Sequence, residues 1–154
     1  MSIRDDMPLL ARHEGDWEGT YTVVDRDGRV TDRHTAHLTC ALPGDGSHDY
    51  YQINRYTWPD GRTEEHHFPG RYLGGGRCRF DTDRIIGEFW EADEHTIYLN
   101  WVYKADPSVR LFELIVLSQD GHHRSRTWQW LKDGVCFQRT LINETRVRDG
   151  STRP

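Results

Sequence analysis

One expected β-hairpin carries the residues whose types and spacing could perform acid–base chemistry. Pro59-Asp60-Gly61 favours a tight turn that pairs Trp58 with Arg62. Counting outward places Arg55 opposite Glu65 and puts His67 on the same face. The same face carries Tyr51 and Ile53, and the other face carries Asn54, Tyr56, Glu64 and His66.

We expect the first face, with His67, to point into the cavity, where its residues form a candidate catalytic group. His67 would titrate near neutral pH and act as a general acid or base, while Glu65 holds its tautomer. Arg55 would stabilise developing negative charge. The alternative is a surface ion pair with a flanking histidine, because a slip of one residue in register exchanges the two faces.

A second hairpin near the carboxyl end offers an anion-binding group. Arg126 and Trp128 lie on its first strand and Arg139 lies on its second. An inward arginine between aromatic side chains would bind a carboxylate strongly, because its fork matches the two oxygens and a cavity excludes competing water. The alternative places Arg139 on the outer wall. The expected substrate-binding residues are Tyr51, Trp101, Arg126, Trp128 and Arg139.

These residues must be positioned by strands, because turn signals recur at regular spacing between alternating segments rich in β-branched and aromatic residues. A short helix through residues 8–13, capped by Asp5 or Asp6 and ended by Gly15, would cover one mouth. Residues 148–154 are expected to form a disordered tail. The ten expected strands are 16–25, 29–42, 48–58, 62–73, 77–82, 84–92, 95–104, 109–118, 122–131 and 135–147.

The connections between these strands are too short for crossover helices. The sequence therefore predicts an all-β fold, a closed up-and-down antiparallel β-barrel of about ten strands with a short N-terminal helix capping one end. Because 154 residues suffice for one core, residues 1–147 are expected to form a single domain. A barrel of this size encloses a cavity.

Several short segments resemble known barrel proteins. The run from Gly15 to Tyr21 resembles the Gly-x-Trp signature of the calycins, the lipocalins and fatty-acid-binding proteins, in which the tryptophan closes the barrel floor. Over roughly residues 8–147 the chain is similar to a bacterial family of lipocalin-like domains of unassigned function. In fatty-acid-binding barrels a basic residue on the last strands holds the ligand's carboxylate, and Arg139 resembles it in position. The segments that carry the family resemblance are residues 56–62, 67–72 and 126–130, with Asp133-Gly134.

Metal and haem are not expected. Residues 51–58 resemble nitrobindin-type haem barrels, but those barrels need a histidine near the last strand and none follows His123. The adjacent pairs His66-His67 and His122-His123 point to opposite faces of a strand, so neither pair chelates. The three cysteines form no Cys-x-x-Cys pair. We therefore expect no cofactor.

Composition limits the partners. With 20 Lys and Arg against 25 Asp and Glu, the net charge of −5 argues against a nucleic-acid binder. No apolar run is long enough to span a membrane and the amino terminus lacks a signal sequence, so a cytoplasmic protein is expected. Residues 95–118 carry large apolar side chains on both faces, which predicts that a second subunit covers the outer face in a homodimer.

Hydrophobic residues make up only 35% of the chain, yet it contains 6 Trp and 7 Tyr, which favours a partly polar cavity. Two functions follow. The first is a cofactor-independent lyase, isomerase or cyclase acting by acid–base chemistry on a small, largely apolar, aromatic or carboxylated molecule. The alternative is a non-catalytic carrier or sensor of a small hydrophobic ligand.

Overall fold

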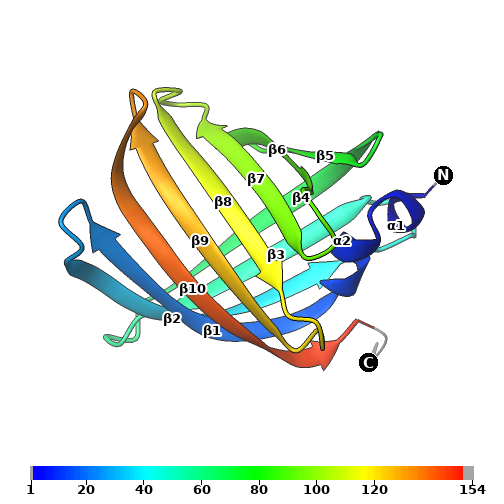
Figure 1. The fold of residues 1–154 in the computed structure, drawn as a ribbon, viewed down its shortest axis with the longest axis horizontal. Helices are drawn as coiled ribbons and strands as arrows, with labels where there is room; N and C mark the ends of the chain where they lie inside the picture. Colours follow the sequence, from blue (N-terminus) through cyan, green and yellow to red (C-terminus); the bar gives the residue numbers. More distant parts are fainter. Residues whose placement is uncertain (1, 151–154) are drawn as a thin grey trace.

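Ten antiparallel strands close into a barrel in the computed structural model, which describes residues 2–150 (Figure 1). Each strand pairs with its neighbours in the chain, and the first strand pairs with the last. This up-and-down order confirms the expected fold class. The strands are β1 (Gly15–Asp25), β2 (Val30–Ala41), β3 (Tyr50–Thr57), β4 (Thr63–Gly74), β5 (Arg77–Asp81), β6 (Ile85–Glu91), β7 (Thr96–Tyr103), β8 (Val109–Leu117), β9 (His123–Lys132) and β10 (Val135–Asp149).

Every strand begins and ends within two residues of its expected bounds, because the turn residues fix where pairing stops. At the β3–β4 turn the Trp58 amide donates to the Arg62 carbonyl across 2.9 Å. Gly61 has a φ of 87°, a conformation that other residues rarely adopt. The turn therefore sets the register of both strands, as the sequence predicts.

Two short helices, α1 (Ile3–Asp6) and α2 (Pro8–Arg12), cover one end of the barrel, and the β1–β2 and β9–β10 hairpins lie at the other end (Figure 1). Helix α2 buries Leu9 and Leu10. The Leu10 amide donates to the Glu91 carboxylate across 2.8 Å, which ties the helix to β6. The helical end is therefore the floor of the barrel and the other end is its mouth.

The caps of these helices differ from the expected ones. Ser2 caps α1 in a capping box with Asp5, whereas α2 starts at Pro8 with no side-chain cap. The expectation that Asp5 or Asp6 caps the Pro8 helix is therefore wrong. Asp6 instead accepts a hydrogen bond from the Tyr72 hydroxyl, which fastens α1 to β4.

Trp17 closes the floor, as the resemblance implies. Its indole N–H donates to the His13 carbonyl across 3.0 Å, and the ring is fully buried. The guanidinium groups of Arg124 and Arg146 lie 4.4 and 4.3 Å from the ring centroid, within cation–π range. At Gly19 a Cβ atom would lie 2.1 Å from the Asn143 carbonyl oxygen, so glycine is required for β1 to approach β10.

The expected boundary of a tail at residue 148 differs from the structure. Arg148 and Asp149 belong to β10, where they pair with Asp16 and Gly15. Residues 151–154 lie outside the described part of the chain. Within residues 2–150, neither helix has the length and apolar character that crossing a membrane requires.

Candidate functional site

A buried cluster of charged side chains lies inside the barrel. Nε of Arg126 donates to Oε2 of Glu113 across 2.6 Å, and its Nη1 donates to Glu144 across 3.2 Å. Arg124 binds Glu144 through two hydrogen bonds, of 3.2 and 3.1 Å. All four side chains are buried. We call Glu113, Arg124, Arg126 and Glu144 the inner charge cluster.

Ion pairing outweighs the effect of burial on the pKa values of Arg126 and Glu144. Burial by itself would lower the pKa of Arg126, but the Glu113 carboxylate reverses this effect and holds the pKa well above its ordinary value. For Glu144, burial raises the pKa, and the neighbouring Arg124 and Arg126 outweigh it, so the pKa lies below the ordinary value. The two positive and two negative charges therefore cancel within the barrel.

Tyr21 connects the inner charge cluster to aromatic side chains nearer the mouth. Its hydroxyl accepts a hydrogen bond from Nη1 of Arg126 across 2.8 Å. Its ring meets Tyr56 edge-on at 5.3 Å between centroids and Trp128 edge-on at 5.5 Å. Burial raises the pKa of the Tyr21 hydroxyl well above its ordinary value, so the group stays protonated.

A cavity of about 50 Å³ lies between the inner charge cluster and these aromatic rings. At roughly 10–15 Å³ for one water, it holds about four small atoms. The indole Nε1 of Trp128 is buried, and no hydrogen-bond acceptor for it exists in residues 2–150. Burying a hydrogen-bond donor without an acceptor costs folding free energy. The indole N–H of Trp128 therefore indicates where a bound molecule could place a hydrogen-bond acceptor. The cavity is lined by Gln52, Asn54, Tyr56, Phe68, Phe80, Leu99, Trp101, Glu113, Ile115, Arg126 and Trp128.

Half-buried aromatic rings extend from this cavity toward the mouth. Trp130 lies 5.5 Å from Trp101, with the rings perpendicular, and 5.9 Å from Trp128. Tyr103 stacks on Trp130 at 6.1 Å. These rings offer flat apolar surfaces next to the polar cavity.

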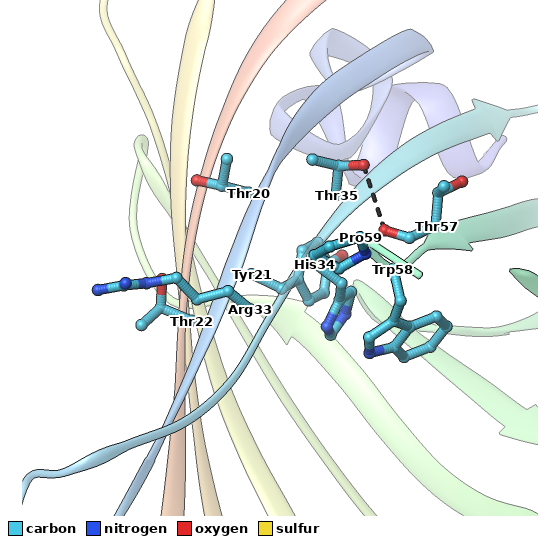
Figure 2. Close-up of a pocket in the computed structure, with 9 residues that line it drawn as sticks. All are labelled: Thr20, Tyr21, Thr22, Arg33, His34, Thr35, Thr57, Trp58 and Pro59. Carbon is cyan, nitrogen blue, oxygen red and sulfur yellow. Dashed lines mark hydrogen bonds between the residues drawn. The ribbon is translucent and has the colours of Figure 1, made fainter. Parts of the chain in front are cut away.

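A histidine and a carboxylate meet on β2 near the mouth. Nδ1 of His34 lies 2.6 Å from Oδ2 of Asp32, and the Trp58 indole also donates to this carboxylate. The imidazole lies between the rings of Tyr21 and Trp58, at 5.0 and 4.5 Å, and its side chain is only 9% exposed. Tyr21, His34 and Trp58 contribute to the lining of a surface hollow of about 360 Å³. Figure 2 shows His34 and Trp58 side by side, away from Thr35 and Thr57.

The sequence-predicted group on the β3–β4 hairpin assembles as the register requires. Arg55 pairs with Glu65, their side chains 3.6 Å apart, and Nε2 of His67 lies 2.7 Å from Glu65. The Tyr51 hydroxyl lies 2.7 Å from Nδ1 of His67. However, the His67 and Glu65 side chains are 44% and 53% exposed.

This group lies on the outer wall. The alternate residues of β3, among them Asn54 and Tyr56, are buried inside the barrel, so Arg55 must point outward. The expectation that His67, Glu65, Arg55 and Tyr51 face the cavity is therefore wrong. Of the alternatives that the sequence left open, the structure shows the surface ion pair with a flanking histidine.

Arg139 also lies outside, on an exposed position of β10. Strand β10 has a bulge between Cys136 and Gln138, and beyond it Gln138 pairs with Trp130 and Arg139 with Gln129. A bulge shifts all later residues to the opposite face. The expectation that Arg139 faces the cavity is wrong for this reason, whereas Arg126, Trp128 and Trp101 do line it.

Sequence reasoning missed several residues of the site, and for Glu113, Asp32 and His34 the sequence carries a signal. Glu113 shares a face of β8 with Leu111 and Ile115, and a carboxylate at an otherwise apolar set of positions is a signal of a buried ion pair. Asp32 and His34 stand two residues apart, which places both side chains on one face of a strand. Within residues 2–150, no three His, Cys, Asp or Glu side chains are arranged to hold a metal ion.

Comparisons with known proteins establish the fold. No family model matches the chain, and no curated protein matches it by sequence. An S-type phycobiliprotein lyase from Guillardia theta is similar in structure, with a TM-score of 0.70, 12% identity, and coverage of 95% of this chain and 93% of the lyase. A protein of unknown function from the DUF3598 family of Nostoc punctiforme PCC 73102 has a TM-score of 0.69 and 19% identity.

The DUF3598 match covers 90% of this chain and 49% of the other protein, so the chain spans about half the length of that protein. At these identities the likeness concerns the fold. The chain thus shares the fold of these proteins, a closed barrel of antiparallel strands like the one that the resemblance of residues 15–21 implies.

Proposed function

We propose that this protein binds a small planar molecule whose aromatic part lies among Trp101, Tyr103 and Trp130 and whose polar part enters the cavity beside Trp128. The observation that carries the proposal is the buried indole N–H of Trp128, a residue that lines the cavity, for which residues 2–150 provide no acceptor. A ligand atom that accepts this hydrogen bond would satisfy it. Aromatic walls with a few convergent polar groups are typical of small-molecule sites.

The experiment uses the six tryptophan indole N–H resonances, observed by NMR with ¹⁵N-labelled tryptophan. Benzamide, benzoate and toluene serve as probes, because each has one benzene ring and they differ in the group attached to it. At least one of them should shift the Trp128 resonance in a saturable manner, and Trp128→Phe identifies that resonance. If none of the three moves it, the proposed function is wrong.

Trp90 provides the matched control. It lies on the outer wall, 4.7 Å from Tyr98, away from the cavity. Trp90→Phe should leave the affinity for the probes unchanged, whereas Trp128→Phe should weaken the affinity of any probe that bonds to the indole N–H by about tenfold. Equal effects of the two substitutions would contradict a site beside Trp128.

Catalysis is the second candidate, now carried by His34 rather than His67. Asp32 accepts the Nδ1 proton of His34, which leaves Nε2 as a basic nitrogen, and stacking between Tyr21 and Trp58 fixes the ring. The S-type phycobiliprotein lyase is an enzyme by its name, so a barrel of this fold is compatible with catalysis. In this proposal His34 removes a proton from carbon next to a carbonyl group of the bound molecule.

Solvent exchange tests this step with acetophenone in D₂O. His34 would take a methyl proton and return a deuteron, so the protein should accelerate deuterium incorporation measured by NMR. His34→Gln should lower the rate by roughly 10²-fold or more, and His67→Gln on the outer wall should not change it. If His67→Gln lowers the rate more than His34→Gln does, the base is His67 on the outer wall. If the parent protein does not accelerate the exchange, the proposed proton removal is wrong.

A further inference from the structure

A continuous series of hydrogen bonds runs along the inner face of β3. The Tyr50 hydroxyl donates to Oε1 of Gln52 across 2.8 Å, and Nε2 of Gln52 donates to Oδ1 of Asn54 across 2.7 Å. Nδ2 of Asn54 then donates to the Tyr56 hydroxyl across 2.9 Å. We call Tyr50, Gln52, Asn54 and Tyr56 the β3 ladder. It arises because alternate residues of one strand point to one face.

The β3 ladder has a direction, and its surroundings determine it. At the floor end, the Cys40 thiol lies 3.9 Å from Oε1 of Gln52, and Nη1 of Arg124 lies 3.8 Å from the sulfur. A cation and an S–H donor favour the amide oxygen of Gln52 on that side, because oxygen carries the negative end of the amide dipole. The amide nitrogens of Gln52 and Asn54 therefore both point toward the mouth.

Within residues 2–150, this direction leaves the Tyr56 hydroxyl proton without a hydrogen-bond acceptor. Its oxygen already accepts from Asn54, so its own O–H is available to the cavity that Tyr56 lines. Burial raises the pKa of Tyr56 to about 12, so the hydroxyl keeps its proton. Each bond of a chain polarises the next one, so the last donor is strengthened.

Tyr56 and Trp128 thus offer two neutral donors to one cavity. Both residues line the cavity of about 50 Å³, and both rings lie against Tyr21, at 5.3 and 5.5 Å. The charges of the inner charge cluster cancel, and Arg126, the cation that lines this cavity within residues 2–150, is already paired with Glu113 and Glu144. A ligand carboxylate would therefore add a negative charge beside an arginine that already has two carboxylate partners. Burying an unpaired charge is far more costly than burying a hydrogen-bonded carbonyl.

Resting on the proposed function, we infer that the ligand presents a neutral carbonyl oxygen, as in an amide or ketone, to the Tyr56 hydroxyl and the Trp128 indole N–H. This specificity departs from the carboxylate that the sequence favours through Arg139. Arg139 is exposed on the outer wall and cannot reach the cavity. The site therefore selects amides and ketones over acids of the same shape.

Benzamide and benzoate test the inference because they share size and shape and differ in charge. Their affinities are measured from the Trp128 indole resonance. Benzamide should bind at least about tenfold more tightly than benzoate. Equal or tighter binding of benzoate overturns the inference, while saturable binding of benzoate or toluene still supports the proposed function. No binding by any probe overturns both.

Removing the terminal donor gives the second measurement. Tyr56→Phe should weaken benzamide about tenfold, by loss of one hydrogen bond, and leave toluene unchanged. Tyr98 on the outer wall, between Trp90 and Phe112, supplies the control. Tyr98→Phe should change neither affinity. Unchanged benzamide affinity in Tyr56→Phe would show that the hydroxyl does not bind the ligand.

Discussion

Arg126 and Glu113 form a hydrogen-bonded ion pair inside the barrel, with 2.6 Å between Nε and Oε2. Both side chains are 4% exposed, so neither can exchange its partner for water. Glu113→Leu should therefore lower the free energy of unfolding by about 3–5 kcal/mol, because it leaves two buried cations, Arg124 and Arg126, with Glu144 as their one carboxylate in the cluster. Urea unfolding near neutral pH measures this loss.

A double variant tests whether the loss of stability in Glu113→Leu comes from unbalanced buried charge or from disturbed packing. Glu113→Leu combined with Arg126→Met removes both charges and leaves Glu144 with Arg124. It should be more stable than Glu113→Leu alone, because apolar pairs often replace buried ion pairs without loss. A double variant less stable than each single one would contradict this account. The exposed Lys132–Asp106 pair is the control, and Lys132→Met should change stability little.

The strands and their register could be predicted because turn chemistry acts locally. Pro59-Asp60-Gly61 determines that Trp58 pairs with Arg62, and the pairing of Arg55 with Glu65 follows from it. Which face points inward depends on packing far away in the sequence. The inner residues of β3 are as polar as its outer residues, because the hydrogen bonds of the β3 ladder allow polar side chains to be buried. The alternation of polar and apolar residues along β3 therefore does not reveal which face points into the barrel.

The bulge in β10 is a second feature that could not be predicted from the sequence. Without it, the two-residue turn would pair Phe137 with Trp130 and Arg139 with Trp128, which would place Arg139 on the inner face, where the sequence led us to expect it. The bulge instead brings Gln138 opposite Trp130. The sequence does not signal this bulge. Residues 136–138 are Cys136, Phe137 and Gln138, and none of them is a glycine or a proline. The inward set of β9 could be predicted, since it carries no bulge within residues 124–130.

Trp17 should contribute to stability through its polar edge as well as its ring. Trp17→Phe keeps an aromatic ring at the floor but leaves the buried His13 carbonyl without the indole donor and weakens contact with two guanidinium groups. We expect a loss of about 2 kcal/mol in the free energy of unfolding, measured by urea titration. Trp90→Phe on the outer wall should lose less. Equal losses would show that ring size alone matters.

The outer wall of β6 to β8 should form a homodimer interface, the expectation drawn from residues 95–118. Leu114, Val116 and Ile86 are 49%, 40% and 37% exposed there. Apolar side chains gathered on one wall favour burial against a second subunit. Light scattering at micromolar concentration should give about twice 18.1 kDa. Leu114→Lys should yield the monomer and Leu141→Lys, on β10, should not, and a monomeric parent would end the proposal.

His13 should make the fold sensitive to mild acid. It lies buried at the floor, where burial, and then the charges of Arg124 and Arg146, hold its pKa well below 6.5. Nδ1 of His13 accepts from Arg124 across 3.1 Å, so Nε2 carries the single ring proton. The folded protein thus keeps His13 neutral at pH values where the unfolded chain protonates it.

Because the unfolded state binds the extra proton, the stability associated with neutral His13 is fully present above about pH 6.5 and declines below it, until the pH reaches the depressed pKa of the folded state. The decline approaches about 1.4 kcal/mol per pH unit for one proton. Urea unfolding between about pH 7.5 and about pH 5 follows this decline above the range in which Glu144 titrates, since Glu144 has its unfolded pKa near 4.5 and its folded pKa lower. His13→Gln should flatten the dependence by up to one proton. A variant with the same slope as the parent would show that other groups cause the acid sensitivity.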